Sequence, residues 1–340
     1  MTSNKTSGSV LSRISPQKQF QAVWQFLTGN YRACEFALTN ICVSRCSFCG
    51  IWRQQPKIMV ERGRALQAID ILAAAGVRFI TLTGGEPLVH PDVSTFVERC
   101  TARGMVTAVL DADPRLLTDE KIDNLRKAGL DFTCISVDHY TDEVEYESRK
   151  IENLLSHIES AVKRVKKAGI RTIASVLISR YNHSELTKLF DKCGELGFDF
   201  IGVNYPEHSL SPVYELGGQA VDLTPEETTA ALEEVIRLKQ KGYPVLNPIE
   251  SMNNIIKYLR NEKVDYYCLG GNRVLFVDWF FNVYPCMHLA QSLGSVFELD
   301  KSKLLSKKCN ACNMSWYRDF SIYFNGAKSL KTLVKSIKAS

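Results

Sequence analysis

The stretch FALTNICVSRCSFC, residues 36–49, joins a short apolar run to a loop that carries three cysteines. The run at 36–42 predicts a β-strand, because it is short, apolar and followed by polar loop residues. Cys42, Cys46 and Cys49 come at the end of this strand, so three thiols fall within eight residues. This spacing lets a single loop surround one metal centre.

The three thiols favour an iron–sulfur cluster over other metals. Thiolates are the usual ligands of such clusters. Three ligands for four irons leave one iron open, and an open iron can bind a small chelating molecule. A zinc loop is the alternative, but structural zinc normally takes four closed ligands. No fourth Cys or His lies near Cys42, Cys46 and Cys49 in the sequence.

After the cysteine loop, short apolar strands alternate with amphipathic helices. The predicted strands are residues 36–42, 77–83, 106–110, 131–138, 171–178 and 198–204. The predicted helices are residues 62–75, 91–103, 118–128, 151–168 and 184–196, each followed by glycine. Parallel strands need such helical crossovers. Six repeats fall short of the eight in a closed barrel, so we expect an α/β fold with a partial, open barrel. Its active site should lie at the carboxyl ends of the strands.

Polar residues follow the second and third predicted strands. The second strand ends on Gly84-Gly85-Glu86-Pro87. Glycines let the backbone approach a ligand closely, and a carboxylate can pair with an ammonium group. Asp111 and Asp113 follow the third strand, where a solvated turn before Pro114 is expected.

Together the cysteine loop and the GGEP segment resemble the radical SAM superfamily, which acts through S-adenosylmethionine (SAM). Its hallmark is CxxxCxxC after the first barrel strand, with an aromatic residue such as Phe48 before the last cysteine. The GGEP segment follows in the order expected, 35 residues from Cys49 to Gly84. The resemblance implies a partial (β/α)6 TIM-like barrel and a 4Fe–4S cluster held by the three cysteines.

The resemblance also implies a set of SAM contacts. The GGEP segment would contact the amino group of SAM. Residues after the fourth and fifth strands would contact its ribose and carboxylate, and Phe48 and residues at the sixth strand would lie beside its adenine. The residues so implied are Phe48, Gly84, Gly85, Glu86, Pro87, Ser136, Asp138, Arg180, Val203 and Asn204. A helix-capping Asp138 and a solvated Arg180 are the structural alternatives.

The chemistry implied by the resemblance is radical chemistry. The reduced cluster passes an electron to the sulfonium of SAM, and the C–S bond breaks to give a 5′-deoxyadenosyl radical. That radical removes a hydrogen atom from the substrate, while the protein supplies placement and excludes water and oxygen.

A second group of four cysteines lies late in the chain, at Cys268, Cys286, Cys309 and Cys312. Four thiolates also suit structural zinc. The sequence around them resembles the SPASM/twitch extensions of radical SAM enzymes, with a predicted hairpin at 273–285. Phe281 stands where a turn glycine is usual. No cysteine follows Cys312, which favours the shorter twitch form with one auxiliary 4Fe–4S cluster for electron transfer or architecture. If one of the four is not a ligand, an open iron is left for substrate.

The sequence predicts four segments. They are an N-terminal extension at 1–30, a radical SAM partial barrel at 31–220, a linker helix with the twitch-like extension at 221–320, and a basic amphipathic tail at 321–340. The tail places its apolar residues on one helical stripe among lysines. A docked terminal helix and contact with an anionic membrane surface both fit this pattern, and the second keeps a lipid-like substrate open.

Composition narrows the class of protein. The net charge of +5 on 340 residues does not call for nucleic acid. No apolar run reaches the ~18 residues of a membrane span, and the N-terminus lacks the apolar core of a secretory signal. Eleven cysteines are many for such a chain, and in a reducing compartment clustered cysteines bind metal or do chemistry. We therefore expect a cytoplasmic enzyme.

Several functions remain open at this level. The first is the oxidation, rearrangement or C–C bond formation of a small molecule, with a flavodoxin- or ferredoxin-type electron donor implied by the resemblance. A radical SAM peptide maturase is the alternative, although the few residues before the first strand leave no room for a leader-recognition domain. A radical SAM enzyme with structural zinc and a non-enzymatic metal-binding protein are further alternatives. The intact GGEP segment disfavours the last of these.

Overall fold

The protein is built on a single nine-stranded sheet. The structure is a computed structural model that describes residues 32–206, 213, 221–300, 304, 309–312 and 314–322. The strands are β1 (Arg32–Ala37), β2 (Val77–Thr83), β3 (Val106–Asp111), β4 (Phe132–Ser136), β5 (Arg171–Leu177), β6 (Phe200–Asn204), β7 (Val274–Val277), β8 (Asn282–Tyr284) and β9 (Gly294–Ser295). Their order is β6-β5-β4-β3-β2-β1-β7-β8-β9. All neighbours from β6 to β7 are parallel, and β8 and β9 are antiparallel.

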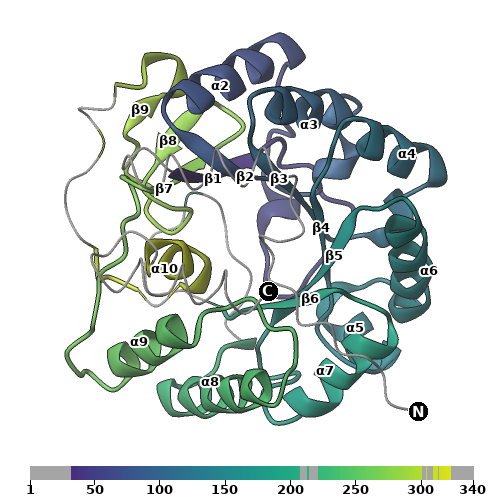
Figure 1. Ribbon diagram of the computed structural model, residues 1–340, viewed down its shortest axis with the longest axis vertical. Coiled ribbons are helices and arrows are strands. Elements are labelled where there is room, and N and C mark those ends of the chain that lie inside the picture. The colour runs from purple at the N-terminus through teal and green to yellow at the C-terminus, as the bar shows by residue number, and fades with distance from the viewer. Residues whose placement is uncertain are drawn as a thin grey trace.

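Helices connect the parallel strands and cover one face of the sheet (Figure 1). The helices are α2 (Arg62–Ala74), α3 (Val93–Ala102), α4 (Asp119–Lys127), α5 (Asp142–Arg149), α6 (Leu154–Lys167), α7 (Leu186–Glu195), α8 (Pro225–Gln240), α9 (Ile249–Leu259) and α10 (Ser315–Ile322). Short 3-10 helices are η2 (Ile51–Arg53), η3 (Pro87–Val89), η4 (Pro114–Leu116) and η6 (Val296–Glu298). The predicted α/β fold with a partial, open barrel is confirmed.

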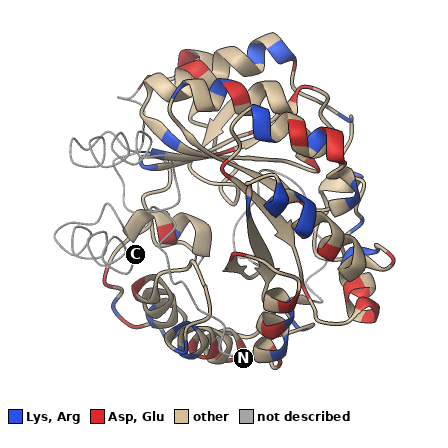
Figure 2. Cartoon of the chain, turned by 45° about the vertical axis from the view of Figure 1, so that its right-hand side comes forward, with Lys and Arg blue, Asp and Glu red and all other residues tan. Residues whose placement is uncertain are grey.

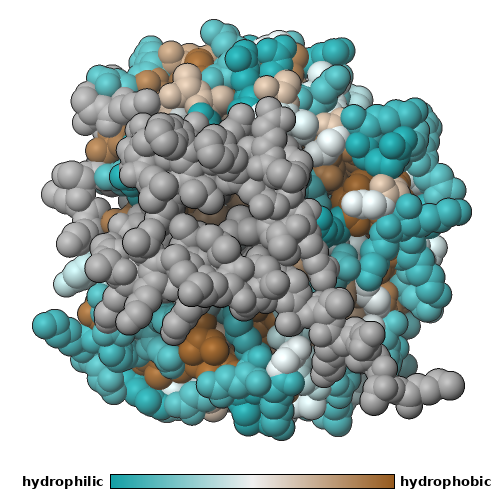
Figure 3. Space-filling model, viewed as in Figure 1, coloured by the Kyte–Doolittle hydropathy of each residue, from teal (hydrophilic) through white to brown (hydrophobic). Residues whose placement is uncertain are grey.

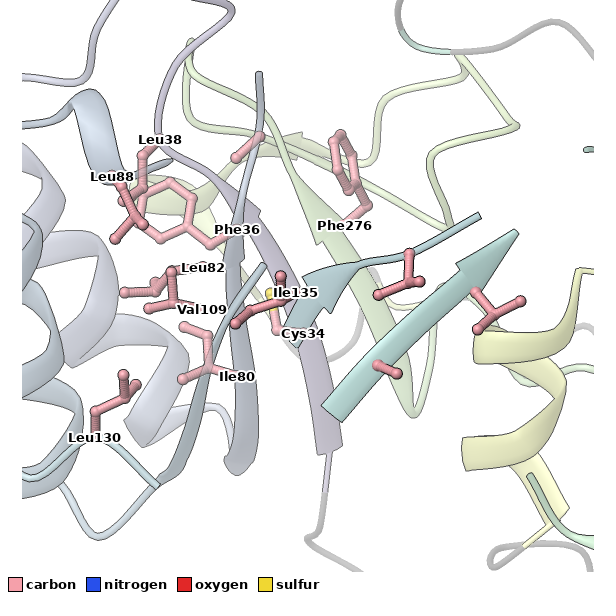
Figure 4. Close-up of a cluster of buried hydrophobic side chains, with 14 of the residues drawn as sticks. Cys34, Phe36, Leu38, Ile80, Leu82, Leu88, Val109, Leu130, Ile135 and Phe276 are labelled. Atoms are coloured by element: carbon pink, nitrogen blue, oxygen red, sulfur yellow. The ribbon is translucent and has the colours of Figure 1, made fainter. Parts of the chain in front are cut away.

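Side chains alternate between two environments along each strand. Those that face the helices form the main core, which Figure 4 shows around Phe36, Leu82 and Ile135. A smaller cluster on the opposite, inner face includes Phe132 and Phe200. Charged residues are concentrated on the outer helices in Figure 2, and the same helices give the described surface in Figure 3 its hydrophilic rim.

The first strand lies earlier than predicted, at Arg32–Ala37 instead of 36–42. Arg32 anchors its start, because its guanidinium donates hydrogen bonds to the carbonyls of Ala75 (2.6 Å) and Asn272 (2.8 Å). Beyond Ala37 the polar side chains of residues 39 and 40 bond to the returning chain. These local bonds replace the regular ladder and turn the apolar run into a loop.

A helix that the sequence did not predict is α5. Its residues 142–149 are mostly acidic, so the segment lacks the apolar stripe that marked the other helices. The helix after it, α6, starts at Leu154, close to the predicted start at 151. Helix α8 begins with a capping box, in which Thr224 and Glu227 bond each other's backbone N–H.

The late hairpin continues the barrel sheet. β7 pairs in parallel with β1, so that Phe36 lies beside Val277. Phe281 adopts a left-handed φ of +67°, the conformation for which glycine is usual, and its buried ring accounts for a non-glycine residue there. The hairpin predicted at 273–285 is therefore part of the main sheet.

Helix α10 connects β6, at one edge of the sheet, with β1, which lies between β2 and β7. Ser315 Oγ donates hydrogen bonds to the Val203 carbonyl (3.2 Å) and to Asn204 Oδ1 (2.8 Å), both on β6. The Tyr317 hydroxyl donates to the buried carboxyl of Glu35 on β1. Burial raises the pKa of Glu35 to about 7, and the bond from Tyr317 opposes this rise.

The Tyr317–Glu35 bond predicts a pH-dependent stability. Because the folded-state pKa of Glu35 is raised, its carboxyl is neutral at pH 6 and ionised at pH 8, where the buried charge most needs a donor. We expect Tyr317→Phe to lower the unfolding free energy by ~1–3 kcal/mol, and by more at pH 8 than at pH 6. Urea unfolding at both pH values measures this. Tyr243→Phe is the control, because Tyr243 bonds Asp191 at the surface. An equal loss at the two pH values would contradict the assignment.

Candidate functional site

The cysteine loop follows β1 at the carboxyl edge of the sheet, and its base is clamped by polar side chains. Asn40 donates from Nδ2 to the Pro56 carbonyl (2.8 Å), and its Oδ1 accepts from the Ile58 N–H (2.7 Å). Thr39 Oγ1 donates to the Ile58 carbonyl (2.6 Å). These bonds fix where the loop leaves the strand and where it returns.

The three thiols of the loop lie near one another and are largely removed from water. Burial raises the pKa of Cys42 and of Cys46 to about 12, and the nearby Cys49 thiol contributes to both rises. The backbone N–H groups of Ser44 and Ile51 donate to the sulfurs of Cys42 and Cys49. Within the described ranges, no three Cys, His, Asp or Glu side chains converge on a single metal ion. Soft sulfur donors with N–H bonds fit a multi-iron cluster, whose irons each take a separate thiolate.

The GGEP segment is pressed against the base of this loop. The Gly85 N–H donates to the Thr39 carbonyl (2.7 Å), and the Glu86 N–H donates to the Ile41 carbonyl (2.8 Å). A Cβ on Gly85 would lie 2.3 Å from the Ile41 oxygen, and one on Gly84 would lie 2.3 Å from the Thr39 oxygen. Both positions therefore require glycine, and the cysteine loop and the GGEP turn form one unit.

The Glu86 carboxylate is buried and serves first as an acceptor for backbone donors. It accepts from the N–H groups of Leu88 (2.9 Å) and Ala112 (2.8 Å), which ties the GGEP turn to the end of β3. Burial raises the pKa of Glu86 to about 7. Burial and the neighbouring Glu86 raise the pKa of Asp111 well above its usual range. The expected solvated turn at Asp111 is wrong, because this carboxyl is fully buried beside Glu86.

At the end of β4, Asp138 is occupied by partners within the protein. Its carboxylate lies 2.8 Å from Arg149 Nε, accepts from Arg149 Nη2 (3.0 Å) and accepts from the Ser148 hydroxyl (2.6 Å). Ser136, two residues earlier, donates to the Asp111 carbonyl (3.2 Å). Arg149 also reaches Cys46 and Phe48. Sequence reasoning missed this arginine, because it ends an acidic helix, although it lies only 11 residues after Asp138.

The other predicted SAM contacts lie in different surroundings. Arg180 is exposed and forms an ion pair with Glu227 at the start of α8 (3.3 Å). Val203 is buried, and Asn247 bonds both its N–H (2.8 Å) and its carbonyl (3.0 Å). Asn204 is half-buried and bonds α10. Pro87 is buried as the first residue of η3. Roles toward SAM for all ten residues remain predictions.

The inner face of the strands is less deeply buried near the carboxyl edge than the helix side. Four residues that alternate onto this face near the strand ends are half-buried, whereas their neighbours on the helix side are fully buried. They are Leu110, Cys134, Leu177 and Gly202. A molecule bound here would meet uncharged side chains.

The four late cysteines are brought together around the start of β7 and the C-terminal side of the sheet. Cys268 and Cys309 face each other across an antiparallel bridge with backbone hydrogen bonds of 2.9 and 3.0 Å. Burial raises the pKa of Cys286, and the thiols of Cys312, Cys268 and Cys309 raise it further. The Gly270 N–H donates to Cys268 Sγ (3.4 Å). Cys286 thus lies within electrostatic reach of the other three thiols, and these four thiols with an N–H donor suit a metal cluster.

Arg318 holds the Cys309–Cys312 loop in place. Its guanidinium is buried and donates to the Cys312 carbonyl from Nε (2.9 Å) and Nη2 (2.6 Å). Nη2 also donates to Asn310 Oδ1 (2.6 Å). Arg318 lies on α10, the helix that also bonds β6 and β1. This one helix therefore holds the second cysteine group against the sheet.

Gly85 provides a test of the contact between the two motifs. An added methyl group must push back the Ile41 carbonyl, so we expect Gly85→Ala to lower the unfolding free energy by ~1–3 kcal/mol. Gly194→Ala is the matched control, because Gly194 lies in α7 with nothing within 4 Å of an added Cβ. Alanine is favoured there by up to ~1 kcal/mol. Urea unfolding of both variants measures the difference, and equal midpoints would argue against the contact.

Comparison with known proteins is now informative. Residues 36–193 match the family described as Radical SAM superfamily. The chain is 27% identical over 289 residues to the AdoMet-dependent heme synthase of Methanosarcina barkeri, which covers 80% of this chain and 81% of that protein. It is 25% identical to the PqqA peptide cyclase of Granulibacter bethesdensis over 75% of this chain and 67% of that protein. The GTP 3′,8-cyclase of Chlorobaculum tepidum is 32% identical over 44% of this chain and 46% of that protein.

Solved structures share the fold. The structure of "Native anSMEcpe with bound AdoMet" matches with a TM-score of 0.60 at 14% identity, covering 81% of this chain and 80% of that one. Streptococcus suis SuiB bound to S-adenosylmethionine matches with a TM-score of 0.60 at 12% identity, covering 92% and 71%. The superfamily implies a 4Fe–4S cluster and SAM. The match at 36–193 gives the chain a radical SAM superfamily domain, and because its relatives are enzymes, the chain is an enzyme.

Proposed function

We propose that this chain cleaves SAM reductively at the site formed by Cys42, Cys46 and Cys49, and that it acts on a small-molecule substrate in the partial barrel. The single observation that supports this most is the bonding of the cysteine loop to the GGEP turn. Two backbone hydrogen bonds and two obligatory glycines join the proposed cluster ligands to the proposed SAM amino-group site.

The cluster and SAM, when bound, would supply a 5′-deoxyadenosyl radical. The chain's own residues hold and shield them. Gly84 and Gly85 let the GGEP turn pack against the base of the cysteine loop, and Phe48 lies within that loop. Asp138 is already bonded to Arg149, so any contact of Asp138 with ribose must use its remaining acceptor capacity. Arg180 must leave its ion pair with Glu227 to meet a SAM carboxylate.

The substrate is proposed to lie on the inner face of the strands. The half-buried residues there, such as Cys134 and Leu177, are uncharged, which suits an abstraction step that needs no ionic partner. A peptide substrate is the second candidate. It is favoured by the likeness to the PqqA peptide cyclase and by the similar fold of SuiB, which has been solved bound to a precursor peptide.

We further propose an auxiliary 4Fe–4S cluster on Cys268, Cys286, Cys309 and Cys312. The mutual interaction of these thiols and the N–H bond to Cys268 support it. Four cysteine ligands would close the cluster, which suits electron transfer or architecture. Structural zinc on the same four thiols is the alternative.

The remaining assignments are also proposals. The proposed segments are an N-terminal extension at 1–30, a radical SAM barrel at 31–220, the twitch-like extension at 221–320, and the tail at 321–340. Most of the tail lies outside the described residues. Among the helices that the structure describes, none is long and apolar enough to cross a membrane. A cytoplasmic location, a flavodoxin- or ferredoxin-type donor, and contact of the tail with a membrane surface complete the proposal.

Replacement of Cys42, Cys46 and Cys49 by alanine tests the SAM site. Anaerobically reconstituted protein should carry about eight irons and form 5′-deoxyadenosine with dithionite, whereas the triple variant should keep about four irons and form none. Cys100→Ala/Cys193→Ala is the control, because these cysteines are buried in α3 and α7. SAM cleavage by the triple variant would refute the site.

Replacement of Cys309 and Cys312 by alanine tests the second site separately. We expect the variant to lose about four irons and to keep dithionite-driven SAM cleavage, because the first site is untouched. Iron, sulfide and zinc analysis of wild type and variant gives the readout. One zinc per wild-type chain, lost in the variant with no change in iron, would replace the auxiliary cluster by a zinc site.

A further inference from the structure

Arg149 is a buried charge that the proposed function does not use. It lies at the end of α5, and only 5% of its surface is exposed. Asp138 lies along one edge of its guanidinium, 2.8 Å from Nε, and accepts a hydrogen bond from Nη2 (3.0 Å). Ser148 donates to the same carboxylate (2.6 Å) and so fixes Asp138 in turn. The arginine is therefore held in one orientation before any ligand binds.

The free side of this guanidinium faces the cysteine loop. Arg149 Nη1 lies 3.8 Å from Cys46 Sγ, and its guanidinium carbon lies 5.3 Å from the centre of the Phe48 ring. Between these two residues, the Ser47 N–H donates to the Ser148 carbonyl (2.9 Å). Three consecutive loop residues thus contact the last two residues of α5.

Two buried carboxylates lie behind this contact. Asp138 accepts from Arg149 Nη2, whereas Nη1 is the nitrogen next to Cys46 Sγ. The Glu145 carboxylate accepts from the N–H groups of Asp138 (2.7 Å) and His139 (2.8 Å). Arg149 is therefore the charged group in contact with the Cys46 sulfur, and it stands between that sulfur and Asp138.

We propose that Arg149 is a positioning residue that locks Cys46, Ser47 and Phe48 in place and sets a permanent positive charge beside the Cys46 sulfur. This inference rests on the proposed function, because it concerns the cluster held there. Reduction adds one electron to that cluster, and a cation about 4 Å away in a poorly hydrated site stabilises the added charge. Arginine is suited to this role because it stays charged and its planar fork matches a carboxylate.

The test is a redox titration of reconstituted full-length protein, followed by EPR. The signal that changes on addition of SAM belongs to the Cys42–Cys49 site, which separates it from any auxiliary cluster. We expect Arg149→Met to make reduction about tenfold less favourable, a fall of ~59 mV for a one-electron couple. Arg149→Lys, which keeps the charge, should recover most of this shift. Arg115→Met is the control, because Arg115 pairs with Asp113 after β3, and no cysteine contacts it among the residues that the structure describes.

The outcomes separate this inference from the proposed function. Wild type without a SAM-responsive signal removes the proposed function itself. Wild type with that signal, together with an unchanged potential in Arg149→Met, overturns the role of Arg149. Weaker SAM binding at an unchanged potential also overturns it, because the arginine would then act on SAM. If Arg149→Met retains no cluster, Arg149→Lys decides: a cluster near the wild-type potential supports the role, and a folded variant without a cluster contradicts it.

Discussion

The contact between the GGEP turn and the base of the cysteine loop is the constraint on which the site depends. It continues the pairing of β1 and β2 beyond the ends of both strands, through the bonds from Gly85 and Glu86 to the carbonyls of Thr39 and Ile41. Backbone groups that approach so closely leave no room for a Cβ. The loop that carries the thiols therefore has its position set by the rigid sheet, in spite of its own irregular backbone.

Buried carboxylates extend this constraint along the same edge. Glu86 after β2, Asp111 at the end of β3 and Asp138 after β4 are all removed from water. A buried carboxylate is costly unless it is bonded. Glu86 and Asp138 draw in N–H or arginine donors from a neighbouring segment, whereas Asp111 accepts from the N–H of Asp113 in its own loop. Glu86 thereby joins the second loop to the third, and Asp138 joins the fourth to α5. These bonds connect the loops along the carboxyl edge of the sheet, and Arg149 at the end of α5 contacts Cys46.

The C-terminal part of the chain is tied to the barrel by the sheet and by α10. β7 adds directly to β1, and α10 bonds β1 through Tyr317 and β6 through Ser315. Arg318 on the same helix holds the Cys309–Cys312 loop. The second cysteine group and the inner face of the barrel are thus fixed by one short helix, which offers a direct structural route between them.

The sequence by itself determined the alternation of strands and helices, the partial barrel and the order of the two motifs, because periodicity and glycine position are local properties. It misplaced β1 at 36–42, since an apolar run does not reveal that Asn40 will bond the returning chain. It left α5 unseen and treated Asp111 as solvated. Only the tertiary structure decided that Asp138 pairs with Arg149, that Arg149 faces Cys46, and that Phe281 can take a left-handed turn. Each of these contacts joins residues from segments that are separate along the chain. Packing between those segments determines the contacts, and the spacing of residues in the sequence does not.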